Sequence, residues 1–261
     1  MKLSSNVAQP NKIKLAVVLA AGRGRRFSRQ LEREAGPEDL EASLPKQYQR
    51  LGGEALLTRS LRPFLRAKTI EAVYVVISEE DRALFEKVVL SDLSPSEINQ
   101  ISLVYGAQDR ARSLEQALLA IERDYQDLLD QIAILSHDAA RPFVSDALIS
   151  AHLEALDHEL VVATALESSD TLFKSVDGKY VGPRLKREEI FRAQTPQSFD
   201  LQRYLEAYRR LSESEIDGLS DAISVFEQED LKIRFVPGDP LNIKVTSASD
   251  WQIAQAILAS L

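Results

Sequence analysis

Five cationic side chains fall in loops beside the ends of predicted strands. They are Arg26, Lys46, Arg141, Arg187 and Lys244. Arginine and lysine bind phosphate oxygens through charge-assisted hydrogen bonds. The chain as a whole has a formal net charge of −8, which disfavours nonspecific binding to nucleic acid or to an anionic membrane surface. We therefore expect a local basic pocket for a small anionic ligand, with neither nucleic acid nor a membrane as a partner.

A glycine-rich loop follows the first apolar run and carries part of this charge. Its sequence is Ala20-Ala21-Gly22-Arg23-Gly24-Arg25-Arg26. Glycines let the backbone turn tightly and bring N–H groups close to phosphate oxygens. The loop lacks the third glycine of a dinucleotide-binding fingerprint, because Phe27 stands there, and it lacks the Gly-Lys-Ser/Thr of a P-loop. It indicates phosphate binding, although a glycine turn with solvated arginines has the same pattern.

A second group of polar residues follows the apolar run at 132–135. Asp138 and Arg141 stand there in the segment 136–143, at the strand end where open α/β sheets bind their ligands. They could serve a hydroxylated or metal-bound ligand and a phosphate, or they could form only a salt bridge. Two further segments are expected to be loops: 192–197, a polar stretch that enters a helix, and 238–246, which carries Lys244.

Scarce residue types exclude several kinds of chemistry. The chain has no cysteine and three histidines, so disulfides, thiolate nucleophiles and cysteine-based metal sites are excluded. His152 and His158 are six residues apart, a spacing that does not place two zinc ligands on one helix face. No Gly-x-Ser-x-Gly motif accompanies His137 and Asp138, so a serine hydrolase is not expected.

The elements that must position these residues alternate between strands and helices. We predict strands at 15–20, 72–77, 101–105, 132–135, 160–166 and 232–236. We predict helices at 56–67, from about 81, at 112–129, 146–156, 201–211 and 221–228, and from 250. The apolar runs do not alternate with polar residues, which is typical of a parallel sheet covered on both faces. The fold class is therefore α/β, a doubly wound, mostly parallel, Rossmann-like sheet in a single domain over 1–261.

Two segments depart from this pattern. Around Asp177-Gly178 the sequence predicts a β-hairpin, and because an isolated two-stranded ribbon is marginally stable, this arm is expected to pack on a second subunit. The segment 27–44 is a highly charged insertion, to be interpreted either as a solvated loop or as a lid.

Composition and hydropathy indicate a globular cytoplasmic enzyme. The chain is 44% hydrophobic and 28% charged, as in ordinary folded domains. No apolar run approaches the roughly 20 residues that a membrane-spanning helix needs, and residues 1–14 lack the apolar core of a signal peptide.

Taken in order, six segments resemble the 2-C-methyl-D-erythritol 4-phosphate cytidylyltransferase family. They are 20–26, 45–48, 106–113, 137–143, 194–197 and 242–246. The resemblance extends from about residue 14 to residue 257. The acceptor that this resemblance implies is 2-C-methyl-D-erythritol 4-phosphate. Several of these segments also occur in the related ribitol-5-phosphate cytidylyltransferases, so ribitol 5-phosphate is the alternative acceptor.

The resemblance implies transfer of CMP from CTP to a polyol phosphate, with Mg²⁺, in a homodimer joined by a β-arm at about 171–187. It implies catalytic roles for Arg26, Lys46 and Lys244. It implies that the nucleotide is bound by Ala20, Ala21, Gly22, Gly24, Gly106, Asp109 and Ser113. It implies that the polyol phosphate is bound by Asp138, Arg141, Thr171, Arg187 and Thr195, with Asp138 also as the metal ligand.

Three departures from the family pattern keep a second class of function open. Ala107 stands where the family has a second glycine, Ala222 stands where it has a second carboxylate beside Asp221, and the insertion at 27–44 is longer than the usual loop. A protein that binds the nucleotide without turning it over would carry such changes. Phosphoryl-type transfer depends mainly on positioning and electrostatics, so the lack of a catalytic histidine does not oppose the enzyme interpretation.

Overall fold

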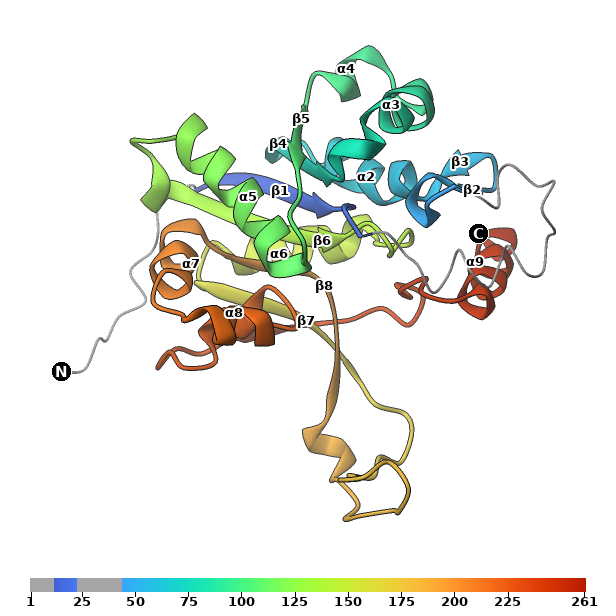
Figure 1. The fold of residues 1–261 in the computed structure, drawn as a ribbon, viewed down its shortest axis with the longest axis vertical. Helices are drawn as coiled ribbons and strands as arrows, with labels where there is room; N and C mark the ends of the chain where they lie inside the picture. Colours follow the sequence, from blue (N-terminus) through green and yellow to red (C-terminus); the bar gives the residue numbers. More distant parts are fainter. Residues whose placement is uncertain (1–11, 23–43) are drawn as a thin grey trace.

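A seven-stranded sheet with the order β5-β4-β1-β6-β8-β7-β9 forms the centre of the protein (Figure 1). The computed structural model describes residues 12–22 and 44–261. The strands are β1 (Ile13–Leu19), β4 (Ile70–Ile77), β5 (Ile101–Tyr105), β6 (Ile132–Asp138), β7 (Val161–Glu167), β8 (Phe191–Asp200) and β9 (Arg234–Pro237). Strand β8 runs antiparallel to both neighbours, and the other neighbouring pairs are parallel. The predicted mostly parallel sheet is confirmed.

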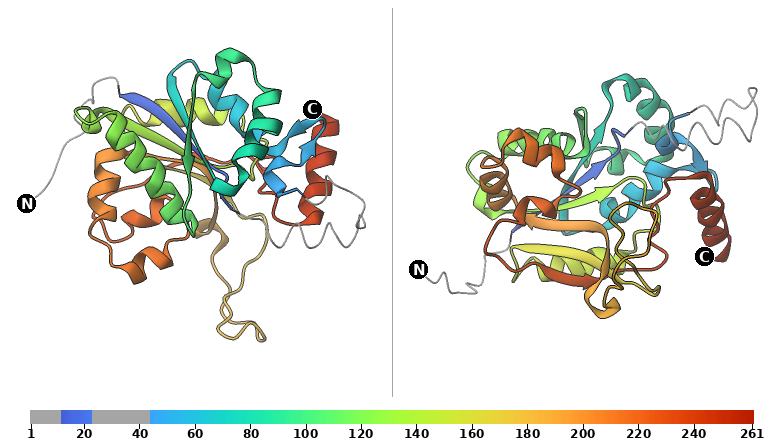
Figure 2. Two further views of the ribbon diagram at one scale, coloured as in Figure 1. Left: turned by 45° about the horizontal axis from the view of Figure 1, so that its top comes forward. Right: turned by 60° about the horizontal axis from the view of Figure 1, so that its bottom comes forward.

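Helices cover both faces of this sheet (Figure 2). The α-helices are α2 (Leu56–Arg66), α3 (Arg82–Leu84), α4 (Pro95–Ile98), α5 (Arg110–Asp124), α6 (Asp146–Ala155), α7 (Leu201–Tyr208), α8 (Glu213–Gly218) and α9 (Ala248–Ser260). Short 3-10 turns include η1 (Lys46–Tyr48) and η7 (Ile223–Phe226), and a two-stranded hairpin pairs β2 (Arg50–Leu51) with β3 (Glu54–Ala55).

Strand β1 shows why its apolar run does not alternate with polar residues. Ala16 and Val18 are fully buried in the core that contains residues of α2 and α6. Leu15 and Val17 are fully buried in a second core that contains residues of α5 and α7. Successive side chains of a strand point to opposite faces, so a strand covered on both sides must be apolar at every position.

A third, smaller core fixes the last loop of the chain. Leu51 and Leu56 pack there with Ala254 of α9 and with Val245, and all four are almost completely buried. The backbone N–H of Val245 also donates to the carbonyl of Ala140, at 2.8 Å. The loop that carries Lys244 is thereby held against the segment that follows β6.

The sequence prediction fails at two elements. The segment 192–197, expected to be a loop, lies within β8, and the expected helix at 221–228 contains only the 3-10 turn η7. Strand β8 is central despite being polar because Gln194 and Gln197 are buried and hydrogen-bonded, to Asp239 at 2.9 Å and to Asp221 at 2.8 Å. Hydrogen-bonded polar residues can be buried at moderate cost, and hydropathy does not reveal them.

An arm projects from the sheet between β7 and β8 (Figure 1). Its turn forms where the sequence predicts it: Gly178 has φ +71°, and the N–H groups of Lys179 and Tyr180 donate to Asp177 Oδ1 at 2.9 and 3.1 Å. The expected ladder is reduced to one bridge between Phe173 and Arg184. Backbone hydrogen bonds from Lys174 to Pro183, from Gly182 to Lys174 and from Leu185 to Leu172 join the two sides of the arm near this bridge. The arm is therefore paired locally and is not a continuous ribbon.

Some predicted features fall outside the described residues. They are Gly24, Arg26 and the part of the insertion at 27–43. Over 12–22 and 44–261, the protein has no helix with the length and apolarity needed to cross a membrane.

A buried ion pair joins the start of β1 to the end of β8. The Lys12 Nζ and Asp200 Oδ2 atoms are 2.7 Å apart, with side chains 2% and 7% exposed. Asp200 also caps α7, because its Oδ1 accepts from the N–H of Arg203 at 2.8 Å.

We expect Lys12→Ala to lower the free energy of unfolding by about 3 kcal/mol, because it leaves a buried carboxylate unpaired. The control is Lys14→Ala, whose partner Asp157 is 44% exposed; this change should cost less than about 1 kcal/mol. Denaturant unfolding of the two variants measures both values. Equal losses in the free energy of unfolding would show that burial does not make the Lys12–Asp200 pair more costly to break than the exposed Lys14–Asp157 pair.

Candidate active site

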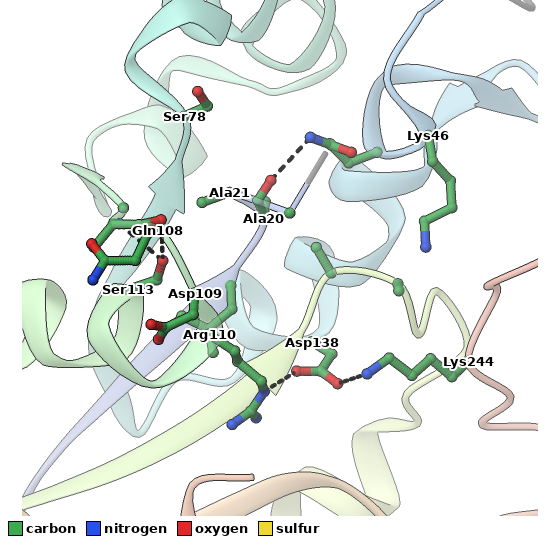
Figure 3. A pocket seen from close by; sticks show the side chains of 17 residues that line it. Ala20, Ala21, Lys46, Ser78, Gln108, Asp109, Arg110, Ser113, Asp138 and Lys244 are labelled. Atoms are coloured by element: carbon green, nitrogen blue, oxygen red, sulfur yellow. Dashed lines mark hydrogen bonds and ion pairs between the residues drawn. The ribbon is translucent and has the colours of Figure 1, made fainter. Parts of the chain in front are cut away.

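A cavity of about 820 Å³ opens at the carboxyl ends of β1 and β6, beside the start of α5 (Figure 3). This is the edge at which parallel α/β sheets bind ligands. The cavity brings together nine of the predicted site residues: Ala20, Ala21, Gly22, Lys46, Gly106, Asp109, Ser113, Asp138 and Lys244. These residues come from five separate parts of the sequence, so the fold assembles the site.

Asp138 lies between two cations at the centre of one wall (Figure 3). Arg110 Nε donates to Asp138 Oδ1 at 3.1 Å, and Lys244 Nζ donates to Oδ2 at 2.7 Å. Burial alone would raise the pKa of Asp138, but the charges of Arg110 and Lys244 outweigh it and hold that pKa well below its usual range. Asp138 is thus ionised at neutral pH, so it attracts cationic groups and has no proton to donate.

Lys46 also lines the cavity, close to the loop that carries Lys244. It begins the turn η1 directly after Pro45, and its Nζ donates to the carbonyl of Val245. The neighbouring Gln47 is 4% exposed and donates through Nε2 to the carbonyl of Ala20 at 3.0 Å. One short turn therefore places a lysine in the site and supports the loop that begins at Ala20.

The far end of the cavity is formed by the loop before α5. A Cβ added at Gly106 would lie 2.5 Å from Ala21 Cβ and 2.8 Å from Ser113 Oγ, so only glycine allows this approach. Ser113 Oγ accepts from the N–H of Ala107 at 3.0 Å. Asp109 caps α5 by accepting from the N–H of Arg112 at 2.8 Å. These contacts fix a wall rich in backbone groups.

Arg112 holds Asp109 in place from outside the cavity. Its Nη1 lies 2.6 Å from Asp109 Oδ2, and it also pairs with Glu213 and Asp217 of α8. Burial would raise the pKa of Asp109, but hydrogen bonds from Arg112 lower it below its ordinary value.

Arg141 and Thr195 lie beneath the cavity and are not among the described residues that line it. Arg141 is 9% exposed, and its guanidinium donates to the carbonyls of Asn242 at 2.8 Å and Ala193 at 3.3 Å. Thr195 is 4% exposed and contacts His137. Both residues brace the loops that carry Asp138 and Lys244.

Thr171 and Arg187 lie on the arm, exposed and outside the cavity of their own chain. Arg187 Nη1 lies 3.5 Å from the carbonyl of Ser169 within the arm. The fold of one chain does not bring these two predicted residues to Asp138.

Arg110 is the main residue that the sequence analysis missed. The segment 106–113 contains both Arg110 and Arg112. Which of the two faces Asp138 depends on the residue at which α5 begins. Residues two apart on a helix point in nearly opposite directions, so the N-cap at Asp109 was the signal that could have identified Arg110.

The two buried histidines carry no charge into the site. Burial lowers the pKa of His137 to about 4 and the pKa of His152 to about 3. Over the described part of the chain, no group of three histidine or acidic residues is arranged to hold a metal ion. Asp109 and Asp138 are the two carboxylates among the described residues that line the cavity.

Comparisons with known proteins agree with this geometry. A family model for 2-C-methyl-D-erythritol 4-phosphate cytidylyltransferase matches residues 14–260. The bifunctional enzyme IspD/IspF of Brucella anthropi is 33% identical over 239 residues, which cover 92% of this chain and 54% of the relative. The corresponding enzyme of Maricaulis maris is 33% identical over 250 residues, covering 94% and 57%. The chain thus spans about half the length of these relatives.

Solved structures show the same fold. The 4-diphosphocytidyl-2C-methyl-D-erythritol synthase of Anaerococcus prevotii has a TM-score of 0.73 and 27% identity, covering 95% of this chain and 97% of that one. The 2-C-methyl-D-erythritol 4-phosphate cytidylyltransferase of Thermus thermophilus has a TM-score of 0.66 and 25% identity, covering 95% and 100%. With its sheet, its cavity and a match over almost its whole length, the chain belongs to the 2-C-methyl-D-erythritol 4-phosphate cytidylyltransferase family.

Proposed function

We propose that this chain transfers the cytidylyl group of CTP to 2-C-methyl-D-erythritol 4-phosphate and releases pyrophosphate. The observation that carries the proposal is the cavity in which Arg110 and Lys244 converge on Asp138, with Lys46 also in the lining. Such a site suits a reaction in which two polyanions must meet. The family supplies the identity of the two substrates.

The chemistry needs electrostatic help more than a general base. A phosphate monoester has its second pKa near 6, so it is largely a dianion at neutral pH. Its oxygen attacks the α-phosphorus of CTP, and the bond from that phosphorus to the β-phosphate bridging oxygen breaks, so pyrophosphate leaves with the electron pair. Fixed cations stabilise the charge that develops on the α-phosphate and on the leaving group. We assign this role to Lys46, Lys244 and Arg26.

We assign the nucleotide to the part of the cavity between the two glycine loops. The Ala20-Ala21-Gly22 backbone would approach the phosphates, and Gly106, Asp109 and Ser113 would contact the base and ribose. The acceptor would lie on the side of Asp138 and Lys244.

The residues present fit a magnesium ion that arrives with the triphosphate. Magnesium is commonly held by one or two carboxylates together with substrate phosphates, and Asp138 is an ionised carboxylate in the cavity wall. When bound, the ion would neutralise phosphate charge beside Lys244.

We also propose a homodimer in which the arm of one chain completes the cavity of the other. The arm exposes large apolar side chains: Phe173, Val176, Tyr180 and Val181 are 54%, 98%, 78% and 74% exposed. Contiguous exposed apolar side chains indicate an interaction surface. Thr171 and Arg187, which do not reach their own cavity, would then bind the acceptor phosphate in the partner's.

Pyrophosphate release tests the reaction itself. The assay contains Mg²⁺ and CTP with either 2-C-methyl-D-erythritol 4-phosphate or ribitol 5-phosphate, and ATP, GTP and UTP serve as controls for the base. We expect release only with CTP and the methylerythritol phosphate. Release with ribitol phosphate alone would show that ribitol 5-phosphate is the acceptor. CTP binding without release would show that the protein binds the nucleotide and is not a transferase.

We expect Lys46→Ala to lower kcat by about 30-fold or more, because it removes one fixed cation from the developing charge. Steady-state kinetics measures the loss, and circular dichroism checks the fold. Lys68→Ala is the matched control, since Lys68 is exposed and lies outside the cavity. Near-normal turnover of the Lys46 variant would remove this lysine from the mechanism.

Mixed dimers test whether the arm acts in the partner's cavity. Lys46→Ala and Arg187→Ala should each have low activity alone. Co-expressed, they should recover about a quarter of wild-type activity, because half of the dimers are mixed and one of two sites in each carries neither change. If Arg187 served its own chain, no site would be restored and activity would stay low.

A further inference from the structure

His137 lies directly before Asp138 and is completely buried. Both of its ring nitrogens are used. Nε2 lies 3.1 Å from the carbonyl oxygen of Arg141, and Nδ1 lies 2.9 Å from Thr195 Oγ1. The ring therefore connects the two ends of the turn from Asp138 to Arg141 with strand β8.

The donors in this arrangement follow from the chemistry of each atom. A carbonyl oxygen only accepts, so Nε2 carries the proton and donates to Arg141. The Thr195 hydroxyl can then donate its one proton to Nδ1, which lies 2.9 Å away. Thr195 Oγ1 in turn accepts from the backbone N–H of Asp138 at 3.2 Å.

These bonds direct the Thr195 hydroxyl inward. The hydroxyl donates to the His137 ring and accepts from the backbone N–H of Asp138. Thr195 is 4% exposed and lies outside the described cavity lining. The same turn is fixed at two further points: the N–H of Arg141 donates to the Asp138 carbonyl at 3.0 Å, and Ala140 accepts from Val245 at 2.8 Å.

We infer that His137 and Thr195 are positioning residues of the proposed transferase: together they fix the backbone of the Asp138–Arg141 turn, so that the Asp138 carboxylate stays between Arg110 and Lys244. Thr195 thereby serves the acceptor site through Asp138 and not through a hydrogen bond to the polyol phosphate. This inference rests on the proposed function, because the geometry it protects is that of the transferase site.

His152 provides a matched control within the same core. It is also completely buried, with Nδ1 2.7 Å from Ser198 Oγ and Nε2 2.8 Å from Thr164 Oγ1. Its bonds end on β7 and β8, and it makes no described hydrogen bond to the Asp138–Arg141 turn. A change at His152 disturbs an equally buried polar network without releasing Asp138.

The kinetic test compares Thr195→Val, Thr195→Ser, His137→Asn and His152→Asn at a temperature where thermal melts show all four to be folded. We expect Thr195→Val and His137→Asn to lower kcat by about 10- to 100-fold, since small displacements of positioned groups have effects of this size. The KM for CTP should stay within about twofold. Thr195→Ser, which keeps the hydroxyl, and His152→Asn should stay within about threefold of wild-type kcat.

Two kinetic results would overturn the inference. If Thr195→Val raised the KM for the polyol phosphate and left kcat intact, Thr195 would contact the acceptor directly. If His152→Asn lowered kcat as much as His137→Asn, the loss would reflect general softening of the core.

A long-range ¹H–¹⁵N correlation spectrum near neutral pH tests the hydrogen bonds without any activity. We expect a proton on His137 Nε2, bonded to the Arg141 carbonyl, and Thr195→Val should change the Nδ1 signal. A proton on Nδ1 alone would overturn the inference. If the wild-type protein released no pyrophosphate with any acceptor, the proposed function would fail, and this spectrum would still decide the arrangement around His137.

Discussion

The carboxylate of Asp138 is the point on which the site depends. It ends β6, and it holds Arg110 at the start of α5 and Lys244 in the loop before α9, at 3.1 and 2.7 Å. The negative charge of the carboxylate offsets the repulsion between the two positive charges. Asp138 therefore holds both cationic side chains in the cavity wall.

The local charge of the cavity opposes the charge of the whole chain. The formal net charge is −8, so the chain as a whole repels an anion, whereas Lys46, Arg110 and Lys244 place positive charge in the cavity lining. The histidines under the site add no positive charge, because burial keeps both rings neutral. A field confined to one cavity favours a small anion that fits inside it over an extended one.

Much of this arrangement could be predicted from the sequence, and the exceptions have physical reasons. The apolar runs of β1 and β6 predict two parallel strands of the sheet. Because parallel strands place their carboxyl ends at one edge, the runs also predict that Ala20 and Asp138 lie at that edge. Strand β8 could not be predicted from hydropathy, since its buried Gln194 and Gln197 owe their positions to hydrogen bonds made by distant residues. Motifs predict Thr171 and Arg187 as acceptor-binding residues, but both lie outside the cavity of their own chain, which sequence spacing could not show.

The reversed direction of β8 sets where the arm can be attached. Glu167 ends β7 and pairs directly with Phe191, the first residue of β8, so the arm leaves and re-enters the sheet at one rung of the ladder. Residues 168–190 are in this sense a modular insertion, because a change in their length would not shift the register of any strand. The sheet and the cavity at its edge are therefore built independently of the length of the arm.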